Sequence, residues 1–575
     1  MAQGKDGQSK VLNKDQDKWV HDSSLDYKGR APLRTSTGAW RASLFIIAIE
    51  FSERLSYFGL ATNLIIYLTK HLHYEVKVAA KMVNYWLGVT TLIPLAGGFL
   101  ADAYLGRFAT VLLSCAVYIG GLVVLTMSQI VPALKPNRSL RLHEIVFFTS
   151  IYFISLGTGG HKPSLESFGA DQFDDDHPTE RRQKLSFFNW WNLGLCSGLL
   201  FGVTIIVYVE DNVGYGLAAI ILTSVMLLSL LIFLLGRPFY RYRLPNGSPL
   251  TPLLCTLAAA VAKRRLLLPF SPEELFEDKN GSKRPLSHTD KLRFLDKAAI
   301  RTENQHLATV TQVEELKLVI SMLPIWLLTL PFGICVAQTS TFFIKQGSTM
   351  NRKLSSNFEI PPSSIFALGA VAMIISVSFY EKLLVPSLRR ITGNERGISM
   401  LQRIGIGMAL SVVAMMTAAM VEKRRLTVAG TEKATAALSM SVFWLVPQFM
   451  ILGLADGFTI VGLQEYFYDQ MPDNMRSLGI ALYLSVLGAA SFLSSFLITM
   501  VDRVTEKIGK QGSWFSSDLN ASRLDLFYWL LAVFSGVNLC MYVVMAKRYS
   551  YKDVDNRVGV ADSPVRGDGE AMAEP

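Results

Sequence analysis

The sequence predicts an all-α membrane protein of twelve spanning helices, arranged as two six-helix bundles. Half of the 575 residues are hydrophobic and only 18% are charged, and the mean hydropathy of +0.32 is too high for a soluble protein of this length. A polar stretch in the middle divides the apolar segments as six plus six. Because a bilayer span needs about 20 mostly apolar residues, the spans are expected near 40–69, 80–101, 108–130, 143–163, 187–208, 214–235, 317–345, 362–384, 398–421, 437–460, 475–500 and 524–547.

The polar segments set the expected domain boundaries. In the central linker, the apolar-periodic stretch 249–268 and the charged run 291–315 suit short amphipathic helices on the membrane surface, and they suit a solvated linker equally well. We expect a cytoplasmic tail over 1–39, a first bundle over 40–235, a cytoplasmic linker over 236–316, a second bundle over 317–547 and a disordered cytoplasmic tail over 548–575.

The basic residues indicate the orientation. Most of the 56 Lys and Arg residues fall on the side of the two termini and the linker, and positive residues stay in the cytoplasm, so both termini are expected there. The N-terminal segment has no apolar core behind a basic cap, so the first helix is expected to be an uncleaved signal anchor. The net charge of +10 follows from this orientation and from anionic lipid, without a nucleic-acid partner.

Three ionisable residues interrupt the first apolar segment: Glu50, Glu53 and Arg54. A charge near the bilayer centre costs about 2.5–3.5 kcal/mol on insertion scales, so it normally faces a protein interior or a water-filled path. Their i, i+3 and i+4 spacing places all three on one helical face. Two carboxylates beside one guanidinium leave a negative charge that a proton can neutralise. This segment therefore predicts a proton-titrated site.

Further ionisable residues lie within the predicted spans. Lys162 sits between a glycine-rich run and Pro163, where it either pairs with the first-helix carboxylates or extends to the interface. Asp456 at mid-span faces a cavity or supports a helix kink, and Glu465 near the mouth forms a gating ion pair or a solvated end. The other candidates for a substrate cavity, for which helix packing is the alternative, are Tyr57, Asn84, Tyr85, Asn192, Gln338 and Thr341.

The motifs of other classes are incomplete. The Asp174–His177 run is expected to be a solvated loop rather than a metal site, and the five cysteines form no CxxC pair. A membrane enzyme would need a nucleophile or metal constellation at one face, and a channel would need rings of charge or a filter loop. A carrier is therefore favoured, with no metal and no cofactor.

A short turn follows the second predicted helix. The helix ends in a run of small residues. This run leads into Asp102 and Arg107 at the cytoplasmic mouth, where a tight turn joins two helices. A weakly similar stretch at 380–393 follows the eighth predicted helix. Matching acidic and basic clusters in both halves indicate an internal repeat, with Asp102, Arg107 and Glu465 in gating or structural roles.

These motifs together resemble the proton-coupled oligopeptide transporters. The match is carried by Glu-x-x-Glu-Arg in the first helix, Gly-Gly-Phe-Leu-Ala-Asp-Ala-Tyr-Leu-Gly-Arg at 97–107 and Phe-Phe-Asn-Trp-Trp-Asn-Leu-Gly at 187–194. The runs Gly-His-Lys-Pro at 160–163, Phe-Gly-Ala-Asp-Gln-Phe-Asp at 168–174 and Gly-Leu-Gln-Glu-Tyr-Phe-Tyr at 462–468 are similar to the plant nitrate and peptide transporter branch. The resemblance runs from about residue 25 to 550.

The resemblance implies a major facilitator fold, in which two bundles rock around a central site. It implies proton symport of nitrate, di- or tripeptides or another small metabolite, with Glu50, Glu53 and Arg54 as the coupling motif and Lys162 as their partner. The proton gradient would be the energy source. A proton-independent facilitator or channel-like carrier of small anions or plant hormones is the alternative. We expect a monomer or weak dimer in the plasma membrane or the vacuolar membrane.

Three positions depart from the family pattern. Val336 stands where the best-known nitrate carrier of this branch has a histidine, just before Ala-Gln in the seventh helix. Asp456 replaces the tenth-helix glutamate and is shorter by one methylene, which alters its reach to a peptide amino terminus. Leu195 follows the fifth-helix signature, where a small residue is usual.

Overall fold

The computed structural model is almost entirely helical, and it divides into two compact units. The larger unit comprises Met1–Ser248, Pro324–Asp469 and Met475–Arg548, and the smaller comprises Pro249–Leu323, Gln470–Asn474 and Tyr549–Pro575. The structure describes residues 18–20, 22, 24–174, 176–245, 247, 250–268, 275–276, 288–300, 308–356, 358–392, 398–431, 438–471, 476–508, 513–516 and 518–549.

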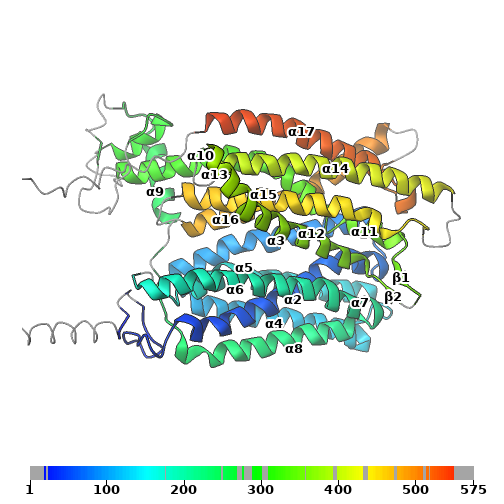
Figure 1. The fold of residues 1–575 in the computed structure, drawn as a ribbon, viewed down its shortest axis with the longest axis horizontal. Coiled ribbons are helices and arrows are strands. Elements are labelled where there is room, and N and C mark those ends of the chain that lie inside the picture. The colour runs from blue at the N-terminus through cyan, green and yellow to red at the C-terminus, as the bar shows by residue number, and fades with distance from the viewer. Residues whose placement is uncertain are drawn as a thin grey trace, which may run out of the picture. The chain divides into compact units, whose positions relative to one another are not determined.

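The first half of the larger unit is a bundle of long helices (Figure 1). It comprises α2 (Ala39–Lys70), α3 (Val76–Leu100), α4 (Arg107–Ile130), α5 (Leu140–Ala170), α6 (Pro178–Phe201), α7 (Val207–Asn212) and α8 (Tyr215–Leu235). Two π-helical turns, η1 (Ala101–Leu105) and η3 (Gly202–Ile206), follow α3 and α6, and two 3₁₀ turns are η2 (Pro132–Leu134) and η4 (Arg237–Phe239).

The second half repeats this pattern. Its helices are α10 (Val310–Ala337), which belongs to the larger unit from Pro324 onward, α11 (Phe342–Thr349), α12 (Phe366–Phe379), α13 (Val385–Thr392), α14 (Met400–Thr431), α15 (Val446–Gln470), α16 (Arg476–Ile508) and α17 (Leu524–Arg548). A short antiparallel pair, β1 (Lys353–Ser355) and β2 (Phe358–Glu359), precedes α12. The remaining turns are the π-helical η8 (Tyr380–Leu384) and the 3₁₀ turns η7 (Pro362–Ile365), η9 (Val442–Leu445) and η11 (Leu519–Ala521).

The smaller unit contains part of the central linker. Its α9 (Leu250–Ala262) lies inside the apolar-periodic stretch, and Leu253, Ala259 and Ala260 are its buried apolar side chains. Within the charged run, a 3₁₀ turn, η6 (Arg293–Ala299), forms first, and residues 310–315 begin α10. Lys317 holds this turn in place, because its ammonium lies 2.6 Å from Asp296 Oδ1 and 2.7 Å from Glu314 Oε1.

The long helices confirm the predicted fold class. In the described residues, 11 helices are long and apolar enough to cross a membrane. The remaining predicted span, the first at 40–69, coincides with α2, which is 32 residues long but carries the three charges in its middle. Several helices run beyond their predicted ends, and α6 continues through η3 and α7 to Asn212 rather than ending near residue 208. Polar residues at these helix ends lie inside the fold, whereas a hydropathy profile ends the span where polar residues begin. Hydropathy alone therefore underestimated the helix lengths.

Small residues let α3 and α5 approach closely. A Cβ added at Gly97 would overlap the backbone carbonyl of Gly159, and two backbones can come this close only where both residues lack a side chain. The contact positions α5, which carries Lys162, against the remainder of the first bundle. Gly120 in α4, by contrast, has nothing within 4 Å of an added Cβ.

Gly97→Ala is expected to destabilise the protein by about 1–3 kcal/mol, because the added methyl group forces two backbones apart. Gly120→Ala is the matched control. It should be neutral or stabilising by up to about 1 kcal/mol, since alanine is the better helix former and open space surrounds the site. Thermal unfolding of both variants in detergent checks this difference, and equal midpoints for the two would contradict the proposed close contact.

Hydrogen bonds among the described residues join the two bundles at one end. We define the distal end as the end where α2 finishes and α17 begins, and the proximal end as the opposite one. The hydrogen bonds that join the bundles include Asn84 Nδ2 to Ser494 Oγ at 3.1 Å, Lys345 Nζ to Thr69 Oγ1 at 3.1 Å, Ser363 Oγ to Asn63 Oδ1 at 3.0 Å and Lys77 Nζ to Asp502 Oδ1 at 3.4 Å. All of these contacts lie in the distal half, so the structure is closed there.

Candidate functional site

The three ionisable residues of α2 form a buried ion-pair cluster. The Arg54 Nε atom lies 2.7 Å from Glu50 Oε1 and 3.0 Å from Glu53 Oε2, so one guanidinium nitrogen serves both carboxylates. Glu50 is 2% exposed, Glu53 0% and Arg54 7%. The sequence-based expectation that they share one face of an interior helix matches this geometry.

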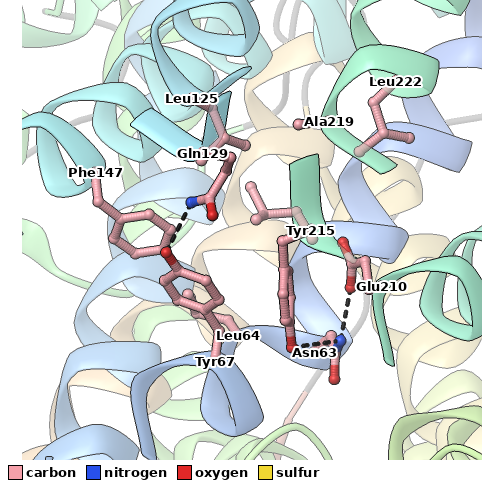
Figure 2. Close-up of a pocket in the computed structure, with 11 residues that line it drawn as sticks. Asn63, Leu64, Tyr67, Leu125, Gln129, Phe147, Glu210, Tyr215, Ala219 and Leu222 are labelled. Carbon is pink, nitrogen blue, oxygen red and sulfur yellow. Dashed lines mark hydrogen bonds between the residues drawn. The ribbon is translucent and has the colours of Figure 1, made fainter. Parts of the chain in front are cut away.

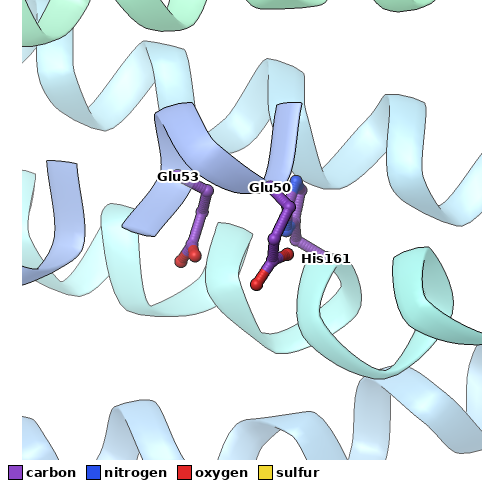
Figure 3. A group of neighbouring side chains, drawn as sticks. All are labelled: Glu50, Glu53 and His161. Atoms are coloured by element: carbon purple, nitrogen blue, oxygen red, sulfur yellow. The ribbon is translucent and has the colours of Figure 1, made fainter. Parts of the chain in front are cut away.

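Helix α5 faces this cluster. Thr158 Oγ1 donates a hydrogen bond to Glu53 Oε1 at 3.5 Å, and His161 lies beside Glu50 (Figure 3). Glu50 Oε2 and both ring nitrogens of His161 are buried without a hydrogen-bond partner among the described residues. Such groups are uncommon in folded proteins and call for an explanation. Here the spare carboxylate oxygen is a place where a proton can bind.

Lys162 lies on α5 next to His161, and its ammonium packs on an aromatic ring. The Lys162 Nζ atom lies 4.4 Å from the centroid of the Tyr57 ring, and Tyr57 itself stacks on Trp86 at 5.8 Å. Within the described part of the chain, no carboxylate lies at ion-pair distance from Lys162. In this conformation its charge is therefore stabilised by a cation–π contact instead of the expected glutamate.

Sequence reasoning missed a third carboxylate in this region. Glu166 lies one turn after Lys162 on α5, within electrostatic range of both Glu50 and Arg54. Its i+4 relation to Lys162 could have identified it. Tyr483 of α16 lies within electrostatic range of Arg54 and Glu166, so the second bundle also borders the site. The carboxylates Glu50, Glu53 and Glu166 outnumber the cations Arg54 and Lys162 by one.

The cluster also has the spacing of a metal site. One ligand atom each from Glu50, Glu53 and His161 lies within 4.8 Å of the others. However, Arg54 already occupies the position between the two carboxylates. A metal ion would have to displace this guanidinium, so we interpret the three side chains as part of the charge cluster.

Two of the expected cavity residues meet at the boundary between the bundles. Asn84 Nδ2 lies 3.1 Å from Ser494 Oγ, and Gln338 Nε2 lies 3.3 Å from the same atom. Asn84 Oδ1 and Gln338 Oε1 are buried without a hydrogen-bond partner among the described residues. These two amides therefore have spare acceptors where α3, α10 and α16 converge.

The other expected cavity residues are dispersed. Thr341 is buried, and its hydroxyl donates to Ala337 O at 2.8 Å. Tyr85 is 41% exposed beside Phe492, with 6.1 Å between ring centroids. Asn192 is exposed and makes no side-chain hydrogen bond within the described ranges. Asp456 has a buried oxygen, Oδ1, without a partner in the described chain, so it remains a candidate to bind a cationic group.

Asp102 and Arg107 form an ion pair at the proximal end of α4. Arg107 Nε lies 3.2 Å from Asp102 Oδ1, and Arg107 also pairs with Asp171, which follows α5. Burial raises the pKa of Asp171 above its ordinary value, against the opposing charges of Arg107 and Arg243. Arg243 Nη1 lies 3.3 Å from Asp171 Oδ1. The motif thus ties three chain segments together, and its partners Asp171 and Arg243 were not identified from the sequence.

Glu465 takes part in a matching contact in the second half. Arg403 Nη1 lies 3.4 Å from Glu465 Oε2, and the guanidinium of Arg403 lies 4.0 Å from the centroid of the Tyr380 ring. Tyr380 begins the π-helical turn η8, which occupies the same place after α12 as η1 does after α3. The equivalent turns agree with the internal repeat.

The acidic run before α6 is not a solvated loop throughout, as was expected. Asp174 is buried, and its Oδ2 atom lies 2.8 Å from Arg34 Nη2. Arg34 Nη1 also lies 2.7 Å from Glu180 Oε1, and Glu180 Oε2 accepts a hydrogen bond from Arg241 Nη1 at 2.6 Å. The expectation was wrong for Asp174 because its cation comes from 140 residues earlier in the chain, a separation that no local pattern reveals.

A second polar cluster lies at the distal end of the first bundle (Figure 2). Glu210 Oε2 accepts a hydrogen bond from Asn63 Nδ2 at 2.7 Å, and the same nitrogen lies 3.0 Å from the Tyr215 hydroxyl. On the other side of a cavity of about 20 Å³, Tyr67 is hydrogen-bonded to Gln129. Sequence reasoning missed Glu210 because the fifth span was expected to end two residues earlier.

The comparisons with known proteins settle the family. A model of the POT family matches residues 108–515, which is more than half of the chain. This chain belongs to the POT family. Within the family it is similar to two Arabidopsis thaliana proteins, NRT1/PTR FAMILY 5.7 at 57% identity and NRT1/PTR FAMILY 5.6 at 58% identity. Each alignment covers 95% of this chain, and they cover 94% and 97% of the two relatives.

Solved structures of the POT family have the same fold. An auto-inhibited POT family peptide transporter superposes with a TM-score of 0.69 at 20% identity, covering 89% of this chain and 98% of that one. The POT family transporter PepTSo gives a TM-score of 0.69 at 19% identity, covering 88% and 98%. Family membership makes the chain a multi-pass membrane transporter and not an enzyme, and these superpositions show its major facilitator fold.

Proposed function

We propose that this POT family member is a proton-coupled symporter of nitrate, di- or tripeptides or another small metabolite. The observation that carries the proposal is the buried cluster of α2 and α5, where three carboxylates face two cations. One net negative charge in a buried site is costly unless it is neutralised. A proton is the smallest group that can do this, and the spare Glu50 oxygen can accept it.

The cluster links proton binding to substrate binding through shared cations. When Glu50 is ionised, it holds the Arg54 guanidinium at 2.7 Å. When Glu50 is protonated, this attraction weakens, and Arg54 and Lys162 can hold an anionic group of the substrate. Loss of the proton restores the ion pairs and releases the substrate. Linkage requires that the substrate in turn tightens proton binding. The pairing of Lys162 with a glutamate is expected in the substrate-free, deprotonated state.

The closed distal end supports access of substrate to the central site from the proximal side in this conformation. With both termini placed in the cytoplasm, the distal half faces the outside or the vacuolar lumen, and the structure corresponds to a carrier closed on that side. The protein would work as a monomer or weak dimer in the plasma membrane or the vacuolar membrane, without a cofactor other than the proton gradient.

The groups around the site bear on the substrate class. Lys162 offers a cation that no described carboxylate holds, and Asp456 offers a buried oxygen that has no partner among the described residues either. A zwitterion such as a peptide would use both groups, whereas nitrate would use only the cation. Val336 is half-buried in α10 and offers neither a charge nor a hydrogen bond. Because the Lys162 cation rests on Tyr57 and not on a titrating carboxylate, a proton-independent carrier of small anions is the second candidate.

Purified protein in liposomes tests both candidates. Labelled nitrate, dialanine and plant hormones are offered with and without an inward proton gradient, and protein-free liposomes are the control. A symporter accumulates at least one compound above its external concentration only when the gradient is present. Equilibration without accumulation, at the same rate under both conditions, would identify the proton-independent carrier.

A further inference from the structure

Glu210 is a buried carboxyl group outside the cluster described above. It lies in α7 at the distal end and is 6% exposed. Its Oε2 atom accepts a hydrogen bond from Asn63, and no cation of the described residues lies at ion-pair distance from it. A carboxylate that is buried without a cation is strongly disfavoured relative to one in water. The burial of Glu210 therefore has an electrostatic cost, which a bound proton would remove.

Asn63 connects Glu210 to the other bundle. Its Nδ2 atom donates to Glu210, while its Oδ1 atom accepts a hydrogen bond at 3.0 Å from the Ser363 hydroxyl. Ser363 belongs to η7 in the second bundle and is 0% exposed. Because an amide has one donor end and one acceptor end, the bond to Glu210 orients the acceptor toward Ser363. The Asn63 side chain thus links the Glu210 carboxyl group to the boundary between the two bundles.

The other groups around Glu210 supply no positive charge to it. Asp211, the next residue on α7, is also acidic, and Tyr215 and Tyr67 are phenols that line the same cavity. Tyr67 is hydrogen-bonded to His143 at 2.6 Å, and this histidine also contacts Leu134 O. His71 stacks on Tyr67, and burial and the neighbouring Lys70 lower its pKa, so both oppose a positive charge on this ring. Because no cation of the described residues pairs with Glu210, a proton is the group that we expect to neutralise it.

We propose that Glu210 is a second proton-binding site, and that the distal end closes preferentially when this carboxyl group is protonated. In the open form, water and external protons reach Glu210 from the distal side. Closing the boundary over Asn63 and Ser363 removes that water, so closure and proton binding favour each other by linkage. The proton stays with Glu210 while the distal end is closed and exchanges when it opens. The inference rests on the proposed function, to which it adds control of the gate by external acidity.

Distance measurements across the distal end test the proposal without a substrate. Spin labels are placed on Val213 of the first bundle and Lys353 of the second, which are both exposed, in a chain whose exposed Cys255 and Cys540 are replaced by serine. The closed population is measured in lipid nanodiscs from pH 8 to pH 5. We expect it to rise as the pH falls. In Glu210→Gln, whose amide oxygen still accepts from Asn63, it should be independent of pH.

Three further variants separate the possible causes. Asp211→Asn, at the neighbouring half-exposed acid, should keep the pH response. Glu50→Gln should also keep the pH response of the closed population. Loss of gradient-driven uptake in that variant can therefore be distinguished from failure of the distal gate. Ser363→Ala should lower the ratio of closed to open protein about 2- to 10-fold at every pH, because one hydrogen bond is lost. An unchanged pH response in Glu210→Gln, or an unchanged closed population in Ser363→Ala, would overturn the proposal.

Discussion

Glu50→Gln is expected to abolish accumulation driven by an inward proton gradient while leaving folded protein in the membrane. The amide has nearly the same shape as a protonated carboxyl group but cannot release a proton, so it fixes the site in its neutral form. Exchange of labelled for unlabelled substrate should persist, because exchange requires no net proton movement. The two rates are measured in liposomes with the compound that the unsubstituted chain accumulates.

Glu75→Gln is the matched control for this experiment. Glu75 precedes α3, and its side chain is 52% exposed beside Lys77, so the substitution should leave accumulation unchanged. The comparison separates loss of the buried titrating group from a general effect of removing an acid. Accumulation by Glu50→Gln at the rate of the unsubstituted chain would eliminate Glu50 as the coupling residue.

Arg425→Met is expected to lower the free energy of unfolding by about 3–5 kcal/mol, because it leaves a buried carboxylate without its cation. Arg425 and Glu422 are both 0% exposed, and two guanidinium nitrogens of Arg425 each lie 2.7 Å from a Glu422 oxygen. The same guanidinium donates to Asn520 Oδ1 at 2.6 Å, and Glu422 accepts from Gln346 at 2.6 Å. One substitution therefore disrupts contacts among α11, α14 and η11.

Arg424→Met provides the control at the neighbouring position. Arg424 is exposed and lies 4.0 Å from the centroid of the Trp444 ring, a contact worth about 0.5–1 kcal/mol. Denaturant unfolding in detergent should show a much smaller change for Arg424→Met than for Arg425→Met. Adding Glu422→Gln to Arg425→Met should recover part of the loss, since the orphaned charge is removed. Equal losses at 424 and 425 would argue against a stabilising buried pair.

The sequence was sufficient for the fold class and for the α2 part of the site. Apolar segments of bilayer length are a strong signal, and a charge inside one is rare enough to stand out. Glu50, Glu53 and Arg54 also share a helical face through their spacing alone, so their proximity could be predicted without tertiary contacts. The roles of these residues in transport stay predictions.

Residues whose partners lie far along the chain could not be predicted in the same way. The pairing of Arg34 with Asp174, and the contact between Asn63 and Ser363, depend on how the helices pack. Glu210 was not predicted for a different reason. In a hydropathy profile, a buried acid at a helix end cannot be distinguished from the start of a loop. The Lys162 ammonium shows a further limit, since a cation can be stabilised by an aromatic ring as well as by an acid.

The distal contacts between the bundles also affect how ligands would be found in screening. Each hydrogen bond of the type made by Asn63, Asn84 and Lys345 contributes about 0.5–1.5 kcal/mol, so together they lower the population of the distal-open form. A compound that binds only that form shows an apparent affinity reduced by its fractional population. Screens against purified protein would therefore favour inhibitors that enter from the proximal side, and an inhibitor acting from the distal side would be recovered more readily after Ser363→Ala.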